Sequence, residues 1–258
     1  MRLAPYDLAK MPTTFDFAVT AVLARTLGYD GIHFDVTGMA SWKYPAEIGW
    51  RRWANILVPL CTLAGLRMSA GVGIEGEPLG YATGDVEALF RKSGRIEKLA
   101  AREVPDRTGY VTITMRDSFR NAWRNSNRQS WEHVRVVLEE SGEDVIVLED
   151  AEDAPMPVGQ RLALYEGAKM NLAVGNGPMV LCWLSEAPYL SFQLPRPRGF
   201  EREHAELVAQ WDRMGFPVGS QLSFRNARQE IVWGPDDADL ILERFDALVR
   251  DEPLVRAA

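Results

Sequence analysis

The sequence is poor in the residues that build disulfide-rich or metal-dependent scaffolds. Its 258 residues include only two cysteines, Cys61 and Cys182, each among apolar neighbours, and three histidines that lie far apart. Two such cysteines are typical of small buried hydrophobic side chains in a reducing compartment. Three dispersed histidines have no metal-ligand spacing. The sequence therefore predicts neither a disulfide scaffold nor a metal site.

Long hydrophobic runs are also lacking. No apolar stretch approaches the roughly 20 residues that cross a bilayer, and Pro5 and Asp7 interrupt the N-terminus before the apolar core of a signal peptide can form. Apolar residues make up 47% of the chain and charged residues 25%, which is the balance of an ordinary folded protein. The net charge of −7 argues against general nucleic-acid binding. We therefore expect a folded cytoplasmic protein with no transmembrane segment and no nucleic-acid partner.

The chain does contain a regular alternation of short β-rich runs with helical stretches. Strand-like runs lie at residues 2–7, 31–36, 67–74, 110–115, 145–148, 171–174, 189–194 and 230–233. Such alternation is typical of parallel sheets with helices on both sides. The polar, proline-containing segment 102–109 has no apolar periodicity and is the best candidate linker. The sequence thus predicts an α/β protein of two Rossmann-like parallel-sheet halves, residues 1–105 and 106–258.

Arginines concentrate just after the strand predicted at 110–115. Residues 112–135 contain five arginines and two acidic residues, a local charge of +3 on an acidic chain. Such a patch suits a small anion such as a phosphate, and Arg116, Arg120 and Arg124 are candidates to clamp a diphosphate. Because four of the arginines recur at every fourth residue, an exposed helix face explains the pattern equally well.

Two loops after predicted strands are further candidates, since ligands of open parallel sheets bind beyond the carboxyl ends of strands. The turn Gly175-Asn176-Gly177-Pro178 precedes a short helix expected to start at Met179. Its glycines allow a ligand to approach the backbone and the helix N-terminus attracts anions, although a simple tight turn is the commoner explanation. Glu149 and Asp150 follow the strand 145–148, where they either accept hydrogen bonds from sugar hydroxyls or lie in solvent.

One motif suggests a different function. The segment from Gly71 to Gly76 matches the G-x-G-x-x-G pattern of dinucleotide-binding loops and follows a predicted strand. No helix is expected to begin at its third glycine, because Pro78 and Gly80 intervene before Asp85, the next candidate helix cap. An NAD(P)-dependent oxidoreductase that uses this loop is therefore an alternative function.

A strand, a glycine–proline turn and an apolar helix follow one another in residues 171–181 (NLAVGNGPMVL), and a further strand begins near Pro188. This order resembles the nucleotide-binding C-terminal half of GT-B glycosyltransferases, with the heptosyltransferase-like group most similar. Gly175 stands where that group has an acidic residue. The segment Met115-Arg116-Asp117 also looks like the part of some fucosyltransferases in which an arginine meets the donor diphosphate. The resemblance covers residues 110–249.

The resemblance implies a GT-B-like protein whose two halves face each other across a cleft. It implies transfer of a sugar from a nucleotide-sugar donor to a saccharide or other acceptor, with no metal or other cofactor, because arginines and a helix N-terminus stabilise the departing diphosphate. A carboxylate of the N-terminal half would deprotonate the acceptor hydroxyl. Asp16 matches the family's acidic residue in position, Asp35 ends a predicted strand, and Glu75 is a third choice. A non-catalytic module that binds a sugar or nucleotide is a second alternative.

Overall fold

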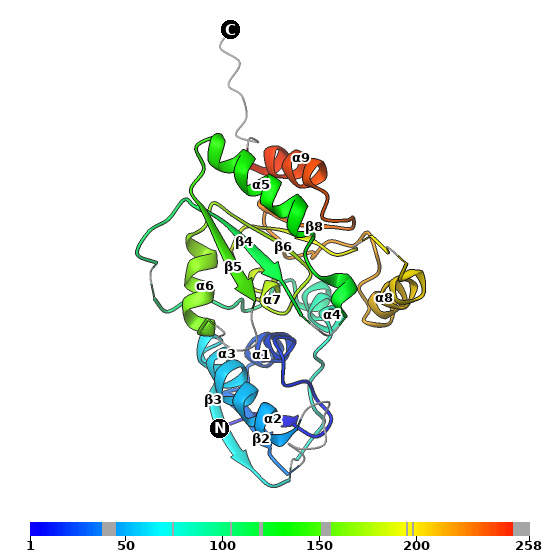
Figure 1. Ribbon diagram of the computed structural model, residues 1–258. Helices are drawn as coiled ribbons and strands as arrows, with labels where there is room; N and C mark the ends of the chain where they lie inside the picture. The colour runs from blue at the N-terminus through cyan, green and yellow to red at the C-terminus, as the bar shows by residue number, and fades with distance from the viewer. Residues whose placement is uncertain are drawn as a thin grey trace.

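The computed structural model describes residues 1–37, 45–73, 75–103, 105–118, 121–150, 156–194, 196–197 and 199–249. These residues form two parallel β-sheets, one of three strands and one of five. The smaller sheet lies at the bottom of Figure 1 and the larger sheet at the top. The predicted α/β class with two parallel sheets is confirmed.

The smaller sheet has the order β1-β2-β3. Its strands are β1 (Leu3–Asp7), β2 (Gly31–Asp35) and β3 (Arg67–Gly71). Helix α1 (Phe17–Thr26) connects the first two strands, and α2 (Ala46–Arg52), the π-helical segment η1 (Trp53–Leu57) and α3 (Val58–Leu63) connect the next two. The wider π turn ends two residues before Pro59, which has no N–H to donate to the carbonyl four residues earlier.

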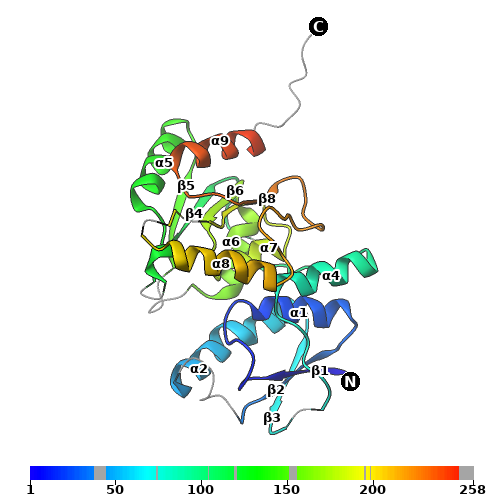
Figure 2. The ribbon, with the colours of Figure 1, turned by 90° about the vertical axis from the view of Figure 1, so that its right-hand side faces the viewer.

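The larger sheet has the order β5-β4-β6-β7-β8, with every neighbouring pair parallel. Its strands are β4 (Val111–Arg116), β5 (Val145–Asp150), β6 (Met170–Val174), β7 (Tyr189–Phe192) and β8 (Gln229–Val232). Helices α5 (Arg128–Glu140) and α9 (Ala238–Val249) cover one face, and α6 (Val158–Gly167) and α7 (Met179–Trp183) cover the other, as Figures 1 and 2 show. Helix α8 (Glu201–Arg213) precedes β8.

Both outer strands of the larger sheet differ from a fully buried strand. The continuous apolar run 145–148 predicts a buried strand, and this prediction is wrong in part, because β5 is an edge strand and Val147 is 42% exposed. At the opposite edge, the Gln221 amide accepts a hydrogen bond from the backbone N–H of Ile231 and donates one to its carbonyl. This side chain occupies backbone groups of β8 that would otherwise be open to another strand.

Helix α4 (Thr83–Ser93) and the segment after it connect the small sheet to the large one. The Glu87 carboxylate accepts hydrogen bonds from the backbone N–H and the hydroxyl of Ser223, and the N–H of Leu99 donates to the carbonyl of Leu184. One continuous cluster of buried apolar side chains includes residues from both parts of the chain. The sequence pattern predicts a helix from Asp85 to Ala101, but α4 ends at Ser93 because Gly94 follows it with a left-handed φ of 73°.

Candidate functional site

The five arginines do not lie on one helix face, so that explanation of their spacing is wrong. Arg116 is the last residue of β4, Arg124 belongs to the short 3-10 helix η2 (Ala122–Arg124), and Arg128 is the first residue of α5. Arg120 lies outside the described residues. The described arginines are therefore divided among the end of β4, the loop that follows it, and helix α5, to which Arg135 also belongs.

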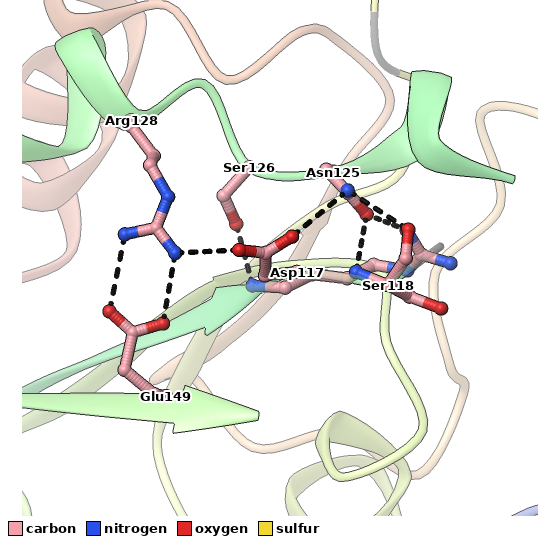
Figure 3. Close-up of polar contacts among 7 residues, drawn as sticks. Asp117, Ser118, Asn125, Ser126, Arg128 and Glu149 are labelled. Carbon is pink, nitrogen blue, oxygen red and sulfur yellow. Dashed lines mark hydrogen bonds and ion pairs between the residues drawn. The ribbon is translucent and has the colours of Figure 1, made fainter. Parts of the chain in front are cut away.

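The Asn125 side chain holds this loop together (Figure 3). Its Oδ1 accepts hydrogen bonds from the Arg116 guanidinium and from the backbone N–H of Ser118, and its Nδ2 donates to the Ser118 carbonyl at 3.1 Å. Ser126 accepts from the N–H of Arg116 at 2.8 Å and donates its own N–H to the Arg116 carbonyl at 3.0 Å. These contacts fix the backbone around Arg116 without any ligand.

Arg128 is paired within the protein. Its guanidinium donates to both oxygens of Glu149, at 3.3 and 3.2 Å, and to Asp117 at 2.9 Å (Figure 3). The hydrogen bonds from Arg128 to Glu149 and Asp117 raise the pKa of the guanidinium. Glu149, predicted to accept hydrogen bonds from a sugar, accepts them here from Arg128, and Asp150 is the last residue of β5.

Arg124 is the arginine that reaches the 175–178 turn. Its Nη2 donates to the carbonyl of Gly175 at 3.3 Å, and its side chain is partly buried. Burial and the neighbouring charge of Arg116 lower the pKa of Arg124 to about 10, whereas the carboxylate of Asp16 opposes this shift. Arg116, Arg124, the turn after β6 and Asp16 of the small-sheet half are thus brought together.

The turn itself offers a polar group with no partner. Asn176 Oδ1 accepts the backbone N–H of Met179 at 3.0 Å and so caps α7, while its Nδ2 is buried without a hydrogen-bond partner among the described residues. Pro178 and Met179 are buried at the start of α7. Because α7 has only five residues, its dipole adds little to the attraction of an anion.

Contacts within the protein account for both glycines of the turn. A Cβ atom on Gly175 would lie 2.2 Å from Oε1 of Gln193, and a Cβ atom on Gly177 would lie 3.0 Å from the Phe15 ring. Phe15 comes from the loop before α1, so this contact also joins the two halves of the chain. The sequence pattern around Phe15 does not indicate that its ring packs on Gly177.

The two candidate bases have different surroundings. Asp16 is the N-cap residue of α1, not a residue of its first turn, and its Oδ2 accepts the Thr14 hydroxyl at 2.8 Å. Asp35 ends β2 and accepts hydrogen bonds from the hydroxyl and the backbone N–H of Thr37, which lower its pKa. Asp35 therefore caps a turn of the small sheet, and no contact among the described residues joins it to Arg124.

Three aromatic side chains that sequence reasoning missed connect the arginine loop to α8. The rings of Trp123 and Phe200 stack with centroids 6.4 Å apart, and the ring of His204 lies 6.5 Å from Trp123. Trp123 lies far from Phe200 and His204 in the sequence, so no local sequence pattern predicts these ring contacts.

The positions of the helices do not support the dinucleotide-binding pattern. The pattern at residues 71–76 follows β3, but the next helix of the described chain, α4, begins only at Thr83. Within the described ranges, no group of three or more histidine, cysteine, aspartate or glutamate side chains could hold a metal ion. Among these same residues, no helix is long and apolar enough to cross a membrane.

Comparison with known proteins assigns the chain to no family. No family model matches the chain, and no curated protein matches its sequence. A solved structure, the bacterial iron-containing dodecameric glycosyltransferase TibC from enterotoxigenic E. coli H10407, is similar over 74% of this chain and 59% of that protein, with 12% sequence identity and a TM-score of 0.42. The match thus spans less than two thirds of the length of that protein. Similarity at this level assigns no function.

Proposed function

We propose that the protein is a glycosyltransferase of the GT-B type, similar to heptosyltransferases, that moves a sugar from a nucleotide-sugar donor to a saccharide or other acceptor without a metal. One observation supports this function best: Arg124 lies partly buried against the carbonyl of Gly175 with Asp16 nearby. A cation, a glycine-containing turn and a carboxylate from the other half of the chain are the groups that this reaction needs.

The donor diphosphate would bind to the guanidinium groups of Arg116 and Arg124. Burial deprives Arg124 of water, so an anion would replace hydration that the guanidinium has lost. The unpartnered Nδ2 of Asn176 would donate a further hydrogen bond. During transfer, negative charge grows on the leaving diphosphate, and fixed cations and N–H donors stabilise that charge.

Asp16 is the preferred general base for the acceptor hydroxyl. It belongs to the half of the chain opposite the arginines, and the Thr14 hydroxyl orients its carboxylate. Asp35 is the weaker candidate, because two hydrogen bonds from Thr37 stabilise its ionised form and hence reduce its basicity.

The first test is binding of nucleoside diphosphates and nucleotide sugars, measured by the melting temperature of the whole chain. A nucleotide at about 100 times its dissociation constant adds about 2.7 kcal/mol of stability. Arg116→Ala should remove most of that gain. No response to any nucleotide would contradict the proposal.

The second test is the rate of sugar transfer. Asp16→Asn should keep the binding response and lower turnover by about 10²–10⁴-fold, as expected when a general base is removed. Asp35→Asn is the matched control and should transfer sugar at the normal rate in the folded fraction. Full turnover in Asp16→Asn would exclude Asp16 as the base.

A non-catalytic module that binds a nucleotide or sugar is a second candidate. It is favoured by the hydrogen bonds that the carboxylates of Asp16 and Asp35 already accept, from Thr14 and Thr37. Nucleotide binding with neither transfer nor hydrolysis of any donor would support this function over the enzyme.

A further inference from the structure

A pocket that includes none of the residues of the arginine loop or the 175–178 turn lies at the C-terminal end of α8. It has a volume of about 430 Å³, which is within the range of small-molecule sites. Three parts of the chain line it: the turn after β1 at residues 10–11, the segment 78–85, and α8 with Met214. Figure 2 shows the beginning of α4 beside the end of α8, where the pocket is formed.

Hydrogen bonds fix the walls of this pocket. The N–H of Gly84 donates to the carbonyl of Met214 at 3.0 Å, and a Cβ atom on Gly84 would lie only 2.1 Å from that oxygen. The Thr20 hydroxyl of α1 donates to the carbonyl of Gly80 at 2.9 Å. Asp85 accepts the N–H of Ala82 at 2.8 Å. The pocket is therefore preformed and does not depend on a ligand to shape it.

The lining combines an apolar wall with two cations, Lys10 and Arg213, and one carboxylate, Asp85, which the Ala82 N–H already occupies. Met11, Leu79 and Met214 supply apolar side chains. Lys10 pairs with Asp7 at 3.0 Å, whereas Arg213 has no ion pair or hydrogen bond from its guanidinium among the described residues. The charge of Arg213 is thus available to a ligand, next to a surface that favours an apolar group.

We propose that this pocket binds a small amphiphilic anion, a carboxylate or a phosphate ester that carries a short apolar chain. Arg213 binds the anionic headgroup, and the chain lies against Met11, Leu79 and Met214. This binding is independent of the glycosyl transfer proposed above, since it uses none of the residues assigned to the nucleotide.

The pocket contains its own reporters, the methyl groups of Met11 and Met214. The full chain, labelled with ¹³C at methionine methyl groups, is titrated with hexanoate and with hexyl phosphate and followed by NMR. Both probes, or either one, should shift the signals of Met11 and Met214 saturably, and the tighter probe identifies the preferred headgroup. The signals of Met115, Met170 and Met179, in the larger-sheet half, should not move.

Two chemical controls and one pair of variants test the assignment of the two ends of the ligand. Hexylammonium should not bind because it repels Arg213, and inorganic phosphate should bind much more weakly than hexyl phosphate because it has no apolar chain. Arg213→Gln should weaken binding by about tenfold or more. Arg202→Gln is the matched control on the same helix, where Arg202 pairs with Glu206, and should bind normally.

The proposal is overturned if no saturable shift of Met11 and Met214 occurs at millimolar probe, or if Arg213→Gln binds as tightly as the original chain. Binding of hexylammonium as strong as that of hexanoate would also overturn it. The methionine spectrum of Arg213→Gln without probe shows whether the variant is folded, so that loss of binding is not confused with loss of structure. Because no nucleotide is added, failure here does not bear on the proposed transferase activity.

Discussion

Replacement of Arg124 by methionine should stabilise the protein and weaken its binding of nucleotides. Burial and the charge of Arg116 lower the pKa of Arg124 from 12.5 to about 10. At about 1.4 kcal/mol per pH unit, keeping this guanidinium charged costs on the order of 3 kcal/mol at neutral pH. Methionine retains the apolar stem and carries no charge, so it removes this cost.

Two losses offset the gain. The hydrogen bond from Arg124 to the carbonyl of Gly175 is long, 3.3 Å, and contributes roughly 1 kcal/mol at most. The attraction to Asp16 is lost as well, but burial of the charge is the largest cause of the lowered pKa. We therefore expect Arg124→Met to raise the free energy of unfolding by about 1–2 kcal/mol, which agrees with the gain seen when buried charges elsewhere are replaced by apolar groups.

Urea denaturation at neutral pH measures the stability, and isothermal titration with nucleoside diphosphates measures the binding. Affinity should fall by roughly 10–100-fold, the value of one charge-assisted hydrogen bond. Arg135→Met is the matched control: Arg135 pairs with Glu132 and Glu139 on the surface of α5, so its loss should lower stability by less than about 1 kcal/mol and leave binding unchanged. A large loss of stability in Arg124→Met with unchanged nucleotide affinity would refute the reasoning, since Arg124 would then be a structural residue.

Three other predictions follow from single contacts. Gly177→Ala should lower the free energy of unfolding by roughly 1 kcal/mol, because the added methyl group would meet the Phe15 ring. The cost should be much smaller in a Phe15→Leu background. An equal cost in both backgrounds, measured by urea denaturation, would rule out that contact as the cause. Hydrogen bonds from Thr37 favour the ionised form of Asp35, so the stability that this carboxylate contributes is present at neutral pH and is lost as the pH falls through its lowered pKa. The difference in free energy of unfolding between the original chain and Asp35→Asn should therefore shrink in acid. A difference that does not change with pH would exclude a stabilising role for the Asp35 carboxylate. Brief proteolysis should cut within 102–109, where residues 102–103 and 106–109 are exposed, yet the fragments should remain associated through the Glu87 and Leu99 contacts. Fragments that separate on gel filtration would contradict this.

The strands were predictable because their signals are local. All eight strand-like runs contain strands, because the signal of a β-branched run acts over a few residues. The polar helix that the sequence predicts at 201–213 is α8. The exposure of β5 was not predictable in this way. It depends on which strand lies at the edge, and strand order is set by contacts between distant segments.

Helix ends show the same division between local and distant causes. Gly94 ends α4, and a glycine is a local stop signal, although the apolar residues beyond it favour a longer helix. At α5, by contrast, a distant residue assists the cap: the Asp236 carboxylate accepts the backbone N–H of Asn127 at 2.6 Å and the Trp131 indole N–H at 2.9 Å. The sequence run 236–239 indicates only that acids begin the next helix.

The spacing of the arginines indicates a helix that does not form, and there is a physical reason for this. A repeat of four residues is typical of a helix only where the backbone can form its hydrogen bonds. Here Ser126 and Asn125 bind the backbone of the loop instead, so side-chain hydrogen bonds replace helical ones. As a result Arg128 turns to Glu149 and Arg124 turns to the carbonyl of Gly175, two directions that one helix face would not give.

Arg124 and Asn176 together give the strongest reason to place a ligand at the turn after β6. The cost of burying the Arg124 guanidinium exceeds what its hydrogen bond to Gly175 returns, and the buried Nδ2 of Asn176 has no partner among the described residues. Each feature costs free energy, and both occur beside Gly175. Positive charge and hydrogen-bond donors are the complement of an anion, so an anion bound at this turn would relieve both costs at once. Such local costs are typical of functional sites, where a protein gives up stability in order to bind.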